Sequence, residues 1–197
     1  IVHGRDRARA EFVVAGIRAA GGDAIAVLGD LADPGAATEV CEAVGDVDIL
    51  VNNAGRYDGL SWWELTDEDW VDVHQANVMS GVRLIRHLVP GMRRRGWGRV
   101  IQIGGGLALQ PAAAQPHYAA TLAARHNMAV SLARELAGTG VTVNVVAPGA
   151  ILTDATRVMA ERAAAHHGWG PSWEDIESTA SREWFPNDVG RFGRPDE

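Results

Sequence analysis

Four short apolar runs, rich in β-branched residues, constrain the fold of this chain more than any other feature. They occupy residues 24–29, 47–55, 99–106 and 141–149, each ends in glycine, and helical patterns separate them. Strands that are apolar almost throughout are typical of parallel sheets, and such sheets are built where strands alternate with helices. The sequence therefore predicts an α/β fold in which helices cover both faces of a parallel sheet.

The segments between these runs carry the start and stop signals of helices. Residues 6–20 are followed by two glycines, which predicts that a helix ends there. Asp33 is followed by Pro34, the usual order of an N-cap and a first helical residue. Residues 66–69 have capping-box spacing and open a long apolar stripe at helical spacing, in which Asn77 is the one amide.

The composition excludes several classes of partner. The formal net charge is −7, the isoelectric point is near 5.5 and no basic block occurs, which argues against nucleic acid or an acidic membrane surface. No apolar run is long enough to span a bilayer. The seven histidines lie without a carboxylate or cysteine at ligand spacing, so we predict no metal site. The single cysteine, Cys41, fits a reducing compartment, and we predict a cytoplasmic protein.

The carboxyl ends of the predicted strands indicate where a ligand would bind. Ligands of open parallel sheets bind beyond these ends, so we expect the loops at 29–33, 52–60, 104–117 and 147–155 to share one crevice. From about residue 155 the sequence becomes alanine-rich and then carries three tryptophans with several glycines and prolines. We interpret residues 155–197 as an excursion from the sheet rather than another layer of it.

Taken together, four motifs resemble the short-chain dehydrogenase/reductase family, in particular its 3-oxoacyl-carrier-protein reductase-like branch. They are NNAG at 52–55, GRVIQI at 98–103, Tyr118 at the start of a helix and VNVVAPGAILT at 143–153. The resemblance implies a Rossmann-like doubly wound parallel sheet and a single dinucleotide-binding domain over residues 1–197. It also implies an NAD(P)-dependent oxidoreductase that reduces a carbonyl or oxidises an alcohol, with residues 155–197 as a lid over the substrate.

The resemblance assigns cofactor-binding roles to several positions. Asp30 and Leu31 match the pair that contacts the adenine, and Asn53, Ala54 and Gly55 match the turn that lies along the cofactor. The segment that holds the nicotinamide carboxamide is matched by Pro148, Gly149, Ile151 and Thr153, and Tyr118 also contacts the cofactor.

Arg5 decides between the two nicotinamide cofactors. It stands at the end of a strand where members that prefer NAD tend to carry an acidic residue, and a guanidinium suits a 2′-phosphate. We therefore predict NADP, with NAD as the alternative. Taken singly, these positions also have structural interpretations, because Asp30 fits a helix-flanking cap and Arg5 fits a solvated surface charge.

The resemblance also predicts that the fold is truncated at both ends. The family opens with a central strand and a glycine-rich phosphate turn, and residue 1 already matches the second strand. After residue 197 the family continues into a further helix and strand. A parallel sheet without its central strand would leave backbone groups of two neighbouring strands unpaired.

The predicted catalytic set is incomplete. Tyr118 matches the proton donor or acceptor of the family, and Asn77 matches the asparagine that anchors its water relay. The serine that hydrogen-bonds the substrate oxygen corresponds to Gly105, and the lysine that lowers the pKa of the tyrosine corresponds to Leu122. All 18 cationic side chains are arginines, so no other lysine can replace it.

One cation on the same helix face is a possible substitute for this lysine. Arg125 follows Tyr118 by seven residues, which places the two on one face. It would either supply positive charge to the site or form a salt bridge at a surface or interface. Its guanidinium cannot relay protons at ordinary pH.

The remaining predictions concern the substrate and the partners. Tryptophans follow the NNAG turn and recur in the late excursion, which favours a sizeable apolar small-molecule substrate, although they would equally pack a lid or a subunit interface. In the family, the helix at 67–95 and the Tyr118 helix pair across two-fold axes, so we expect a homodimer or homotetramer. Two other functions stay open: a catalytically silent binding or regulatory subunit, and isomerisation or dehydration without redox chemistry.

Overall fold

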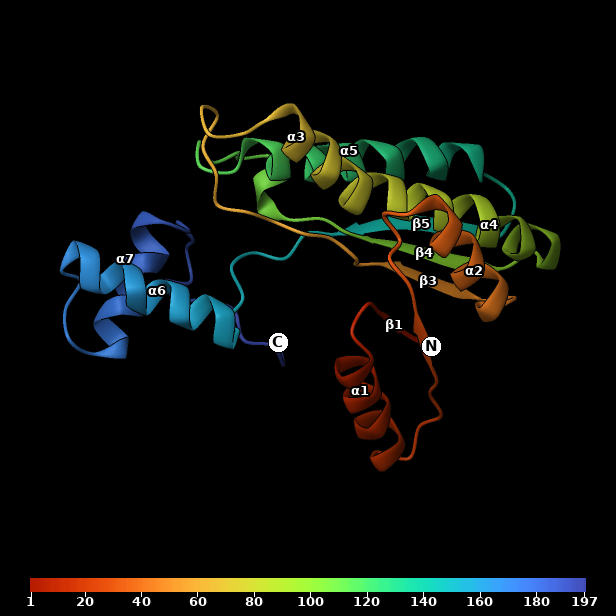
Figure 1. Ribbon diagram of the computed structural model, residues 1–197, viewed down its shortest axis with the longest axis horizontal. Helices are drawn as coiled ribbons and strands as arrows, with labels where there is room; N and C mark the ends of the chain where they lie inside the picture. The colour runs from red at the N-terminus through yellow and green to blue at the C-terminus, as the bar shows by residue number, and fades with distance from the viewer. The chain divides into compact units, whose positions relative to one another are not determined.

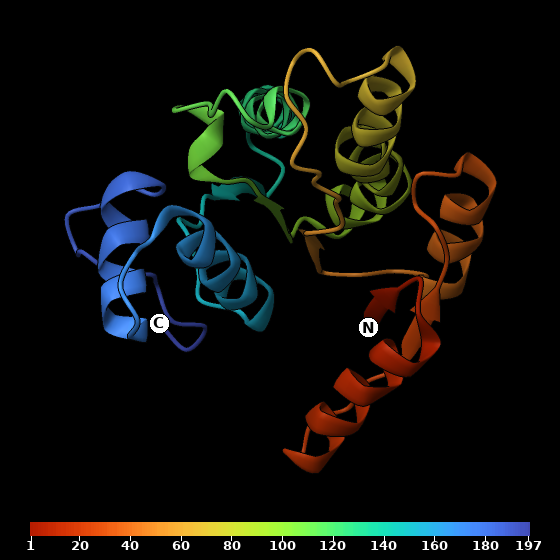
Figure 2. The same cartoon turned by 60° about the vertical axis from the view of Figure 1, so that its left-hand side comes forward.

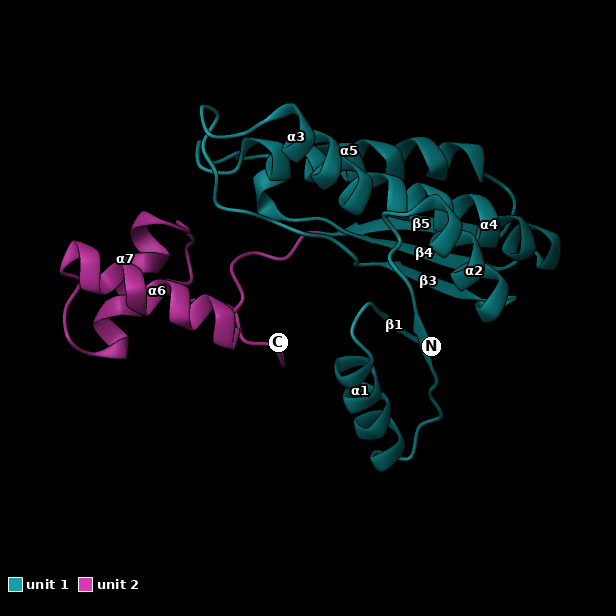
Figure 3. Ribbon diagram, viewed as in Figure 1, with its two compact units in different colours: residues 1–146 teal, residues 147–197 magenta.

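The computed structural model describes residues 1–197, in which strands and helices alternate (Figure 1). The strands are β1 (Val2–Gly4), β2 (Ala26–Leu28), β3 (Ile49–Asn52), β4 (Gly98–Ile103) and β5 (Val141–Val146). The helices are α1 (Arg7–Ala19), α2 (Pro34–Val44), α3 (Asp67–His74), α4 (Ser80–Arg95), α5 (Pro116–Glu135), α6 (Asp154–His167) and α7 (Trp173–Glu183). This order confirms the predicted α/β class. The chain divides into two compact units, residues 1–146 and 147–197 (Figure 3).

Unit 1 contains all five strands, and every strand pair is parallel. The sheet is in two pieces, one with the order β1-β2 and one with the order β3-β4-β5. Helix α1 packs against β1 and β2, apart from the helices of the three-stranded piece (Figure 2). Because the strands are parallel, the carboxyl ends of β3 and β4 meet at one edge, where the candidate site lies.

The three-stranded sheet is covered on one face within unit 1. Helices α4 and α5 lie along this face (Figure 1), and Leu50 and Asn52 of β3 point into it and are buried. The alternate residues Ile49 and Val51 are 55% and 52% exposed. The sequence predicts helices on both faces, and the alternating burial of β3 shows that unit 1 by itself supplies only one of the two layers.

The long helix predicted after residue 66 is interrupted. The capping box forms as predicted, because the amide of Asp69 donates to Thr66 Oγ1 at 3.2 Å and the amide of Thr66 donates to the Asp69 carboxylate at 2.9 Å. After α3, however, residues Gln75–Met79 adopt a π-helical turn before α4 begins. Such turns are rare and occur frequently at functional sites. Asn77 lies in this turn.

Unit 2 has a hydrophobic core of its own. Ala160, Ala180 and Phe192 are fully buried in it, and the rings of Trp169 and Trp184 lie 4.8 Å apart. The unit contains all of residues 155–197, the predicted lid. The prediction of a single domain stays a prediction, because two compact units of one chain can belong to one domain. None of the helices in the two units combines the length and apolar character needed to cross a membrane.

Candidate active site

Tyr118 lies in the first turn of α5, which begins at Pro116. Its side chain is partly buried, and its ring lies 5.8 Å from the ring of Tyr57, in the loop that follows β3. Burial raises the pKa of the Tyr118 phenol, while the charge of Arg125 lowers it and Tyr57 raises it further. A phenol with a raised pKa stays protonated near neutral pH, so Tyr118 is in the state that donates a proton.

The Asn77 side chain connects the π-turn to this helix and to the loop after β3. Its amide nitrogen donates to the carbonyl of Arg56 at 2.9 Å and to Thr121 Oγ1 at 3.0 Å. Its amide oxygen accepts from the amide of Arg56 at 2.7 Å. Thr121 in turn donates to the carbonyl of Tyr118 at 2.7 Å. Asn77 is 1% exposed, so these bonds fix its amide and order the segments on either side of Tyr118.

The positions matched to the family's serine and lysine carry no polar side chain. Gly105 is buried and extended, and it precedes a 3₁₀ turn at Gly106–Ala108. Leu122 is 2% exposed on the inner face of α5. Neither residue can hydrogen-bond a substrate oxygen through its side chain.

Arg125 is buried and anchored by main-chain oxygens. Its Nε donates to the carbonyl of Asn77 at 2.5 Å, its Nη1 to that of Ile103 at 2.7 Å, and its Nη2 to that of Ala54. It is 5% exposed and takes part in no ion pair. Of the two interpretations that the sequence leaves open, the structure therefore excludes a salt bridge within this chain. Burial lowers the pKa of Arg125, but a guanidinium stays charged in proteins.

Buried side chains contact the turn after β3. The Ala54 carbonyl accepts a hydrogen bond from Arg125, and a Cβ on Gly55 would lie 3.0 Å from Asn77 Oδ1. This close approach accounts for glycine at the end of the NNAG motif. Asn53 is exposed, so the turn presents its outer side to solvent.

The residues predicted for the adenosine end also come together. Arg5 follows β1 and its guanidinium lies 3.3 Å from the carboxylate of Asp30, which follows β2. Their side chains are 69% and 49% exposed, so both are accessible to a ligand. The pKa of Asp30 is lowered first by a hydrogen bond from the amide of Ala32 and also by Arg5. Leu31 is buried, and its carbonyl accepts from Arg83 at 2.9 Å.

The four residues predicted at the nicotinamide belong to unit 2. Ile151 forms a parallel bridge with Gly193, and Thr153 caps α6 by accepting from the amide of Thr156 at 3.2 Å. Pro148 and Gly149 precede them in the same segment. The role of these residues toward a nicotinamide stays a prediction.

Arg56 and Tyr57 escaped the sequence analysis, because they lie in an irregular loop, where no periodicity marks them. Thr121 lies three residues after Tyr118 on the same helix face, a position that suggests a hydrogen-bond donor, and it donates to the Tyr118 carbonyl. His117 is also buried, at 1% exposure, with neither ring nitrogen hydrogen-bonded, and it meets the ring of Trp70 edge-on at 6.1 Å.

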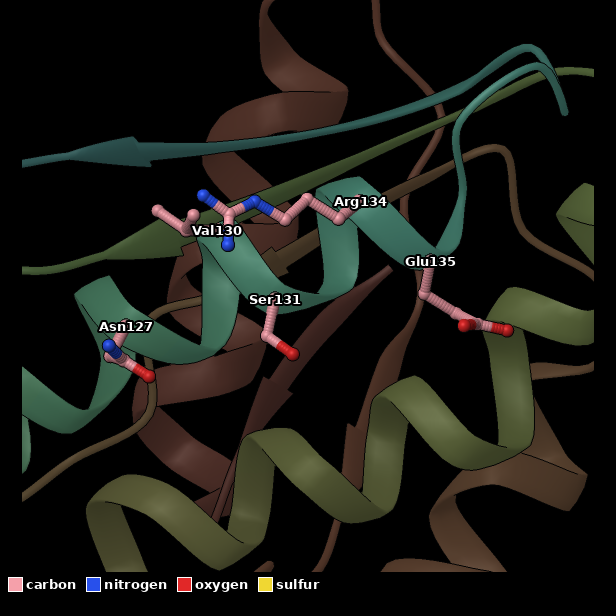
Figure 4. Close-up of a pocket in the computed structure, with 5 residues that line it drawn as sticks. All are labelled: Asn127, Val130, Ser131, Arg134 and Glu135. Carbon is pink, nitrogen blue, oxygen red and sulfur yellow. The ribbon is translucent and has the colours of Figure 1, made fainter.

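A shallow groove lies on the later turns of α5, away from Tyr118 in its first turn (Figure 4). Its lining residues are Asn127, Val130, Ser131, Arg134 and Glu135. Ser131 and Glu135 point toward α4 in Figure 4. This groove is therefore not the candidate active site.

Comparisons with known proteins identify the family. The model of the short chain dehydrogenase family matches residues 1–164. An uncharacterized oxidoreductase, YvaG, of Bacillus subtilis is 34% identical over 169 residues, which are 85% of this chain and 63% of that protein. The 3-oxoacyl-[acyl-carrier-protein] reductase FabG of Salmonella typhimurium is 39% identical over 136 residues, which are 67% of this chain and 56% of that protein. The chain thus spans about six tenths of the length of these relatives.

The solved structures agree with this assignment. The crystal structure of L-sorbose reductase from Gluconobacter frateurii, complexed with NADPH and L-sorbose, matches with a TM-score of 0.89 and 32% identity. The match covers 98% of this chain and 74% of the reductase. The chain belongs to the short-chain dehydrogenase/reductase family of oxidoreductases, and its fold is the predicted Rossmann-like one.

Proposed function

We propose that the protein is an NADP-dependent reductase of a carbonyl compound, with Tyr118 as the proton donor and Asn77 as its support. The observation that carries the proposal is the hydrogen-bonded chain from the π-turn to the first turn of α5. In it, Asn77 binds Thr121, and Thr121 binds the carbonyl of Tyr118. These bonds join the π-turn to the helical turn that carries the neutral phenol of Tyr118, and ligands of parallel sheets bind beyond the carboxyl ends of their strands.

The residues of unit 1 fit the adenosine end of NADP. Arg5 and Asp30 are exposed side by side, and a 2′-phosphate would compete with the Asp30 carboxylate for the Arg5 guanidinium. The exposed turn of Asn53, Ala54 and Gly55 would lie along the cofactor. NADPH in the sorbose reductase supports NADP over NAD. When bound, the reduced nicotinamide supplies the hydride, and Pro148, Gly149, Ile151 and Thr153 would hold its carboxamide.

The direction of the reaction follows from the residues at the two altered positions. Without a side-chain donor at Gly105, the substrate oxygen loses a hydrogen bond that is typically worth roughly 10²–10³ in rate. Without a lysine at position 122, Tyr118 is hard to deprotonate, which impairs alcohol oxidation more than carbonyl reduction. We therefore propose a slow reductase.

Exposed aromatic rings support a sizeable apolar substrate. Tyr57, Trp62 and Trp63 are 63%, 57% and 95% exposed in the loop that leads from β3 to α3. The rings of Trp62 and Trp70 pack at 5.3 Å, which gives this loop an apolar wall. Aromatic walls bind apolar groups at little entropic cost, because their side chains have few rotatable bonds. The relatives act on an acyl-carrier-protein substrate and a sugar, and the wall favours the more apolar of these classes.

The test is NADPH oxidation by the purified protein with a panel of aliphatic and aromatic ketones and β-ketoacyl thioesters. We expect slow turnover that falls by at least roughly 10²-fold in Tyr118→Phe, which removes the phenol proton and keeps the ring. Tyr57→Phe is the matched control, and it should keep turnover within a few-fold. A protein that binds NADPH but turns over no substrate, or whose turnover survives Tyr118→Phe, contradicts the proposal.

A catalytically silent binding subunit is the second candidate. The observation that favours it is the burial of Gly105 and Leu122, which leaves no polar side chain at either altered position. It predicts that NADPH binds and that Tyr118→Phe leaves the biological role intact.

The partners and the compartment complete the proposal. The groove along α5 and the neighbouring surface of α4 would pair with a second copy, giving a homodimer or homotetramer, which light scattering tests. Residues 155–197 would act as the lid over the substrate. Cys41 is a free, buried thiol, as suits the reducing cytoplasm.

A further inference from the structure

Arg125 is a buried cation without an anionic partner. Its three hydrogen bonds all end on main-chain carbonyls, and none of the ion pairs of the chain includes it. Burying a charge costs several kcal/mol, and carbonyl dipoles compensate it only in part. A neutral side chain could hydrogen-bond these main-chain carbonyls at a lower desolvation cost than a guanidinium does. A buried charge that lacks a counter-ion and acts on a titratable group is a feature of functional sites.

The three carbonyls come from the segments that surround Tyr118. The Asn77 carbonyl belongs to the π-turn, the Ile103 carbonyl ends β4, and the Ala54 carbonyl lies in the turn after β3. Helical side chains tilt toward the N-terminus of their helix, so the long Arg125 side chain reaches back toward the first turn of α5. The guanidinium thus lies where the π-turn, the end of β4 and the turn after β3 come together.

Two ionisable groups act electrostatically on Tyr118, namely Arg125 and Tyr57. Arg125 lowers the pKa of the phenol, whereas Tyr57 raises it. The effect is mutual, because Tyr118 raises the pKa of Arg125. Arg125 is thus a cation that favours a Tyr118 phenolate from the buried side of α5.

We propose that Arg125 is a positioning residue that supplies the positive charge of this site and stabilises the phenolate that forms when Tyr118 gives up its proton. The inference rests on the proposed reductase function. In that reaction the carbonyl carbon gains the hydride of the reduced nicotinamide, and the carbonyl oxygen takes the phenol proton. The phenolate left behind is re-protonated by water. Arg125 lowers the energy of this state without exchanging a proton itself, since a guanidinium keeps its protons.

The chain offers a direct test, because it contains two tyrosines, Tyr57 and Tyr118. In the Tyr57→Phe background, phenolate absorbance in the ultraviolet reports Tyr118 alone. We expect Arg125→Met to move the Tyr118 titration to higher pH. The matched control is Arg134→Met, which removes the same charge from an exposed position of the same helix and should leave the titration where it was. If Tyr118 titrates at the same pH in a folded Arg125→Met protein as in the Arg134→Met control, the inference is overturned.

Arg125→Gln decides the question if the methionine variant does not fold. Its amide nitrogen still donates to a main-chain carbonyl, but its side chain carries no charge. We therefore expect Tyr118 to titrate at higher pH than in the parent also in this variant. A folded glutamine variant that titrates as the parent does contradicts the role of the charge. Arg125→Lys keeps the buried cation at pH 7, where turnover is measured.

Turnover separates this inference from the function on which it rests. At pH 7 we expect kcat for carbonyl reduction to fall by roughly 10²-fold in Arg125→Met and by less in Arg125→Lys, with KM nearly unchanged. The titration needs neither NADPH nor a substrate. If turnover depends on Tyr118 but the Tyr118 titration is the same with and without Arg125, the reductase function stands and the inference fails. If Arg125→Met shifts the titration but no substrate is turned over, the effect of Arg125 on Tyr118 stands and the reductase function fails.

Discussion

Replacing Asn77 by alanine tests the network that holds the candidate site. The substitution removes three hydrogen bonds, two to the main chain of Arg56 and one to Thr121. Each such bond contributes about 1 kcal/mol net, and a buried group left without a partner costs about 1–3 kcal/mol. Thr121 keeps its bond to the Tyr118 carbonyl, and the Arg56 groups are only partly buried. We therefore expect the free energy of unfolding to fall by about 2–4 kcal/mol.

The assay is urea unfolding followed by circular dichroism, with the slope of the transition compared between the proteins. The matched control is Gln110→Ala, which removes an exposed amide from the loop before α5 and should change the stability by less than about 0.5 kcal/mol. An unchanged slope is required for the comparison, because a changed slope reports a different compactness of one state. A loss below about 1 kcal/mol for Asn77→Ala would show that the amide does not make these bonds in solution.

Three further substitutions probe other parts of the chain. Gly140→Ala should lower the melting temperature clearly more than Gly138→Ala. Both glycines have positive φ, but only at Gly140 would a Cβ collide with neighbouring backbone. Equal losses would refute the close approach of Gly140 to this backbone. Arg194 lowers the pKa of Glu177 by hydrogen bonding, so the folded-state value lies below the unfolded one. The contribution of Glu177 to the stability of unit 2 should therefore be full above the unfolded pKa and be lost as pH falls through the folded pKa. In tryptophan fluorescence, Glu177→Gln should weaken the acid dependence, and the remainder should come from Glu197, whose pKa is lowered by its hydrogen bond from Arg191. Arg5→Ala should weaken NADPH binding by roughly tenfold or more in a fluorescence titration and leave NADH nearly unaffected, whereas equal losses would argue against a 2′-phosphate site.

The sequence predicted the elements well because their signals are local. The capping box at residues 66–69 and the N-cap at Asp33 both form, since each needs only neighbouring groups to be satisfied. The predicted strand at 47–55 was too long, because its last residues are the turn whose Ala54 carbonyl is taken by Arg125. Apolar composition marks that segment, but it does not mark where the ladder stops.

The π-turn and the Arg125 contacts could not be predicted in the same way. The stripe that contains Asn77 fits an uninterrupted helix, and the change of hydrogen bonding depends on partners in the loop after β3 and in α5. Similarly, the spacing from Tyr118 to Arg125 selects a helix face, but it does not tell whether that face is buried. Both features depend on residues distant in sequence, and periodicity contains no information about those.

Leu122 and Arg125 are best understood together. Both lie on the buried face of α5, one and two turns beyond Tyr118, and both are at most 5% exposed. A lysine at the first of these buried positions would have to bury its ammonium group without water or a ligand. Leucine avoids the desolvation cost of that charge. The arginine at the second position carries its charge to the same interior by a longer side chain, and strand-end carbonyls satisfy its donors. The altered positions therefore do not leave the site without a cation, because Arg125 keeps one on the buried face of α5, where it lowers the pKa of the Tyr118 phenol. In the proposed reductase, proton donation depends on Tyr118 and Arg125 and the binding of NADPH on Arg5, and for that reason the two have to be measured separately.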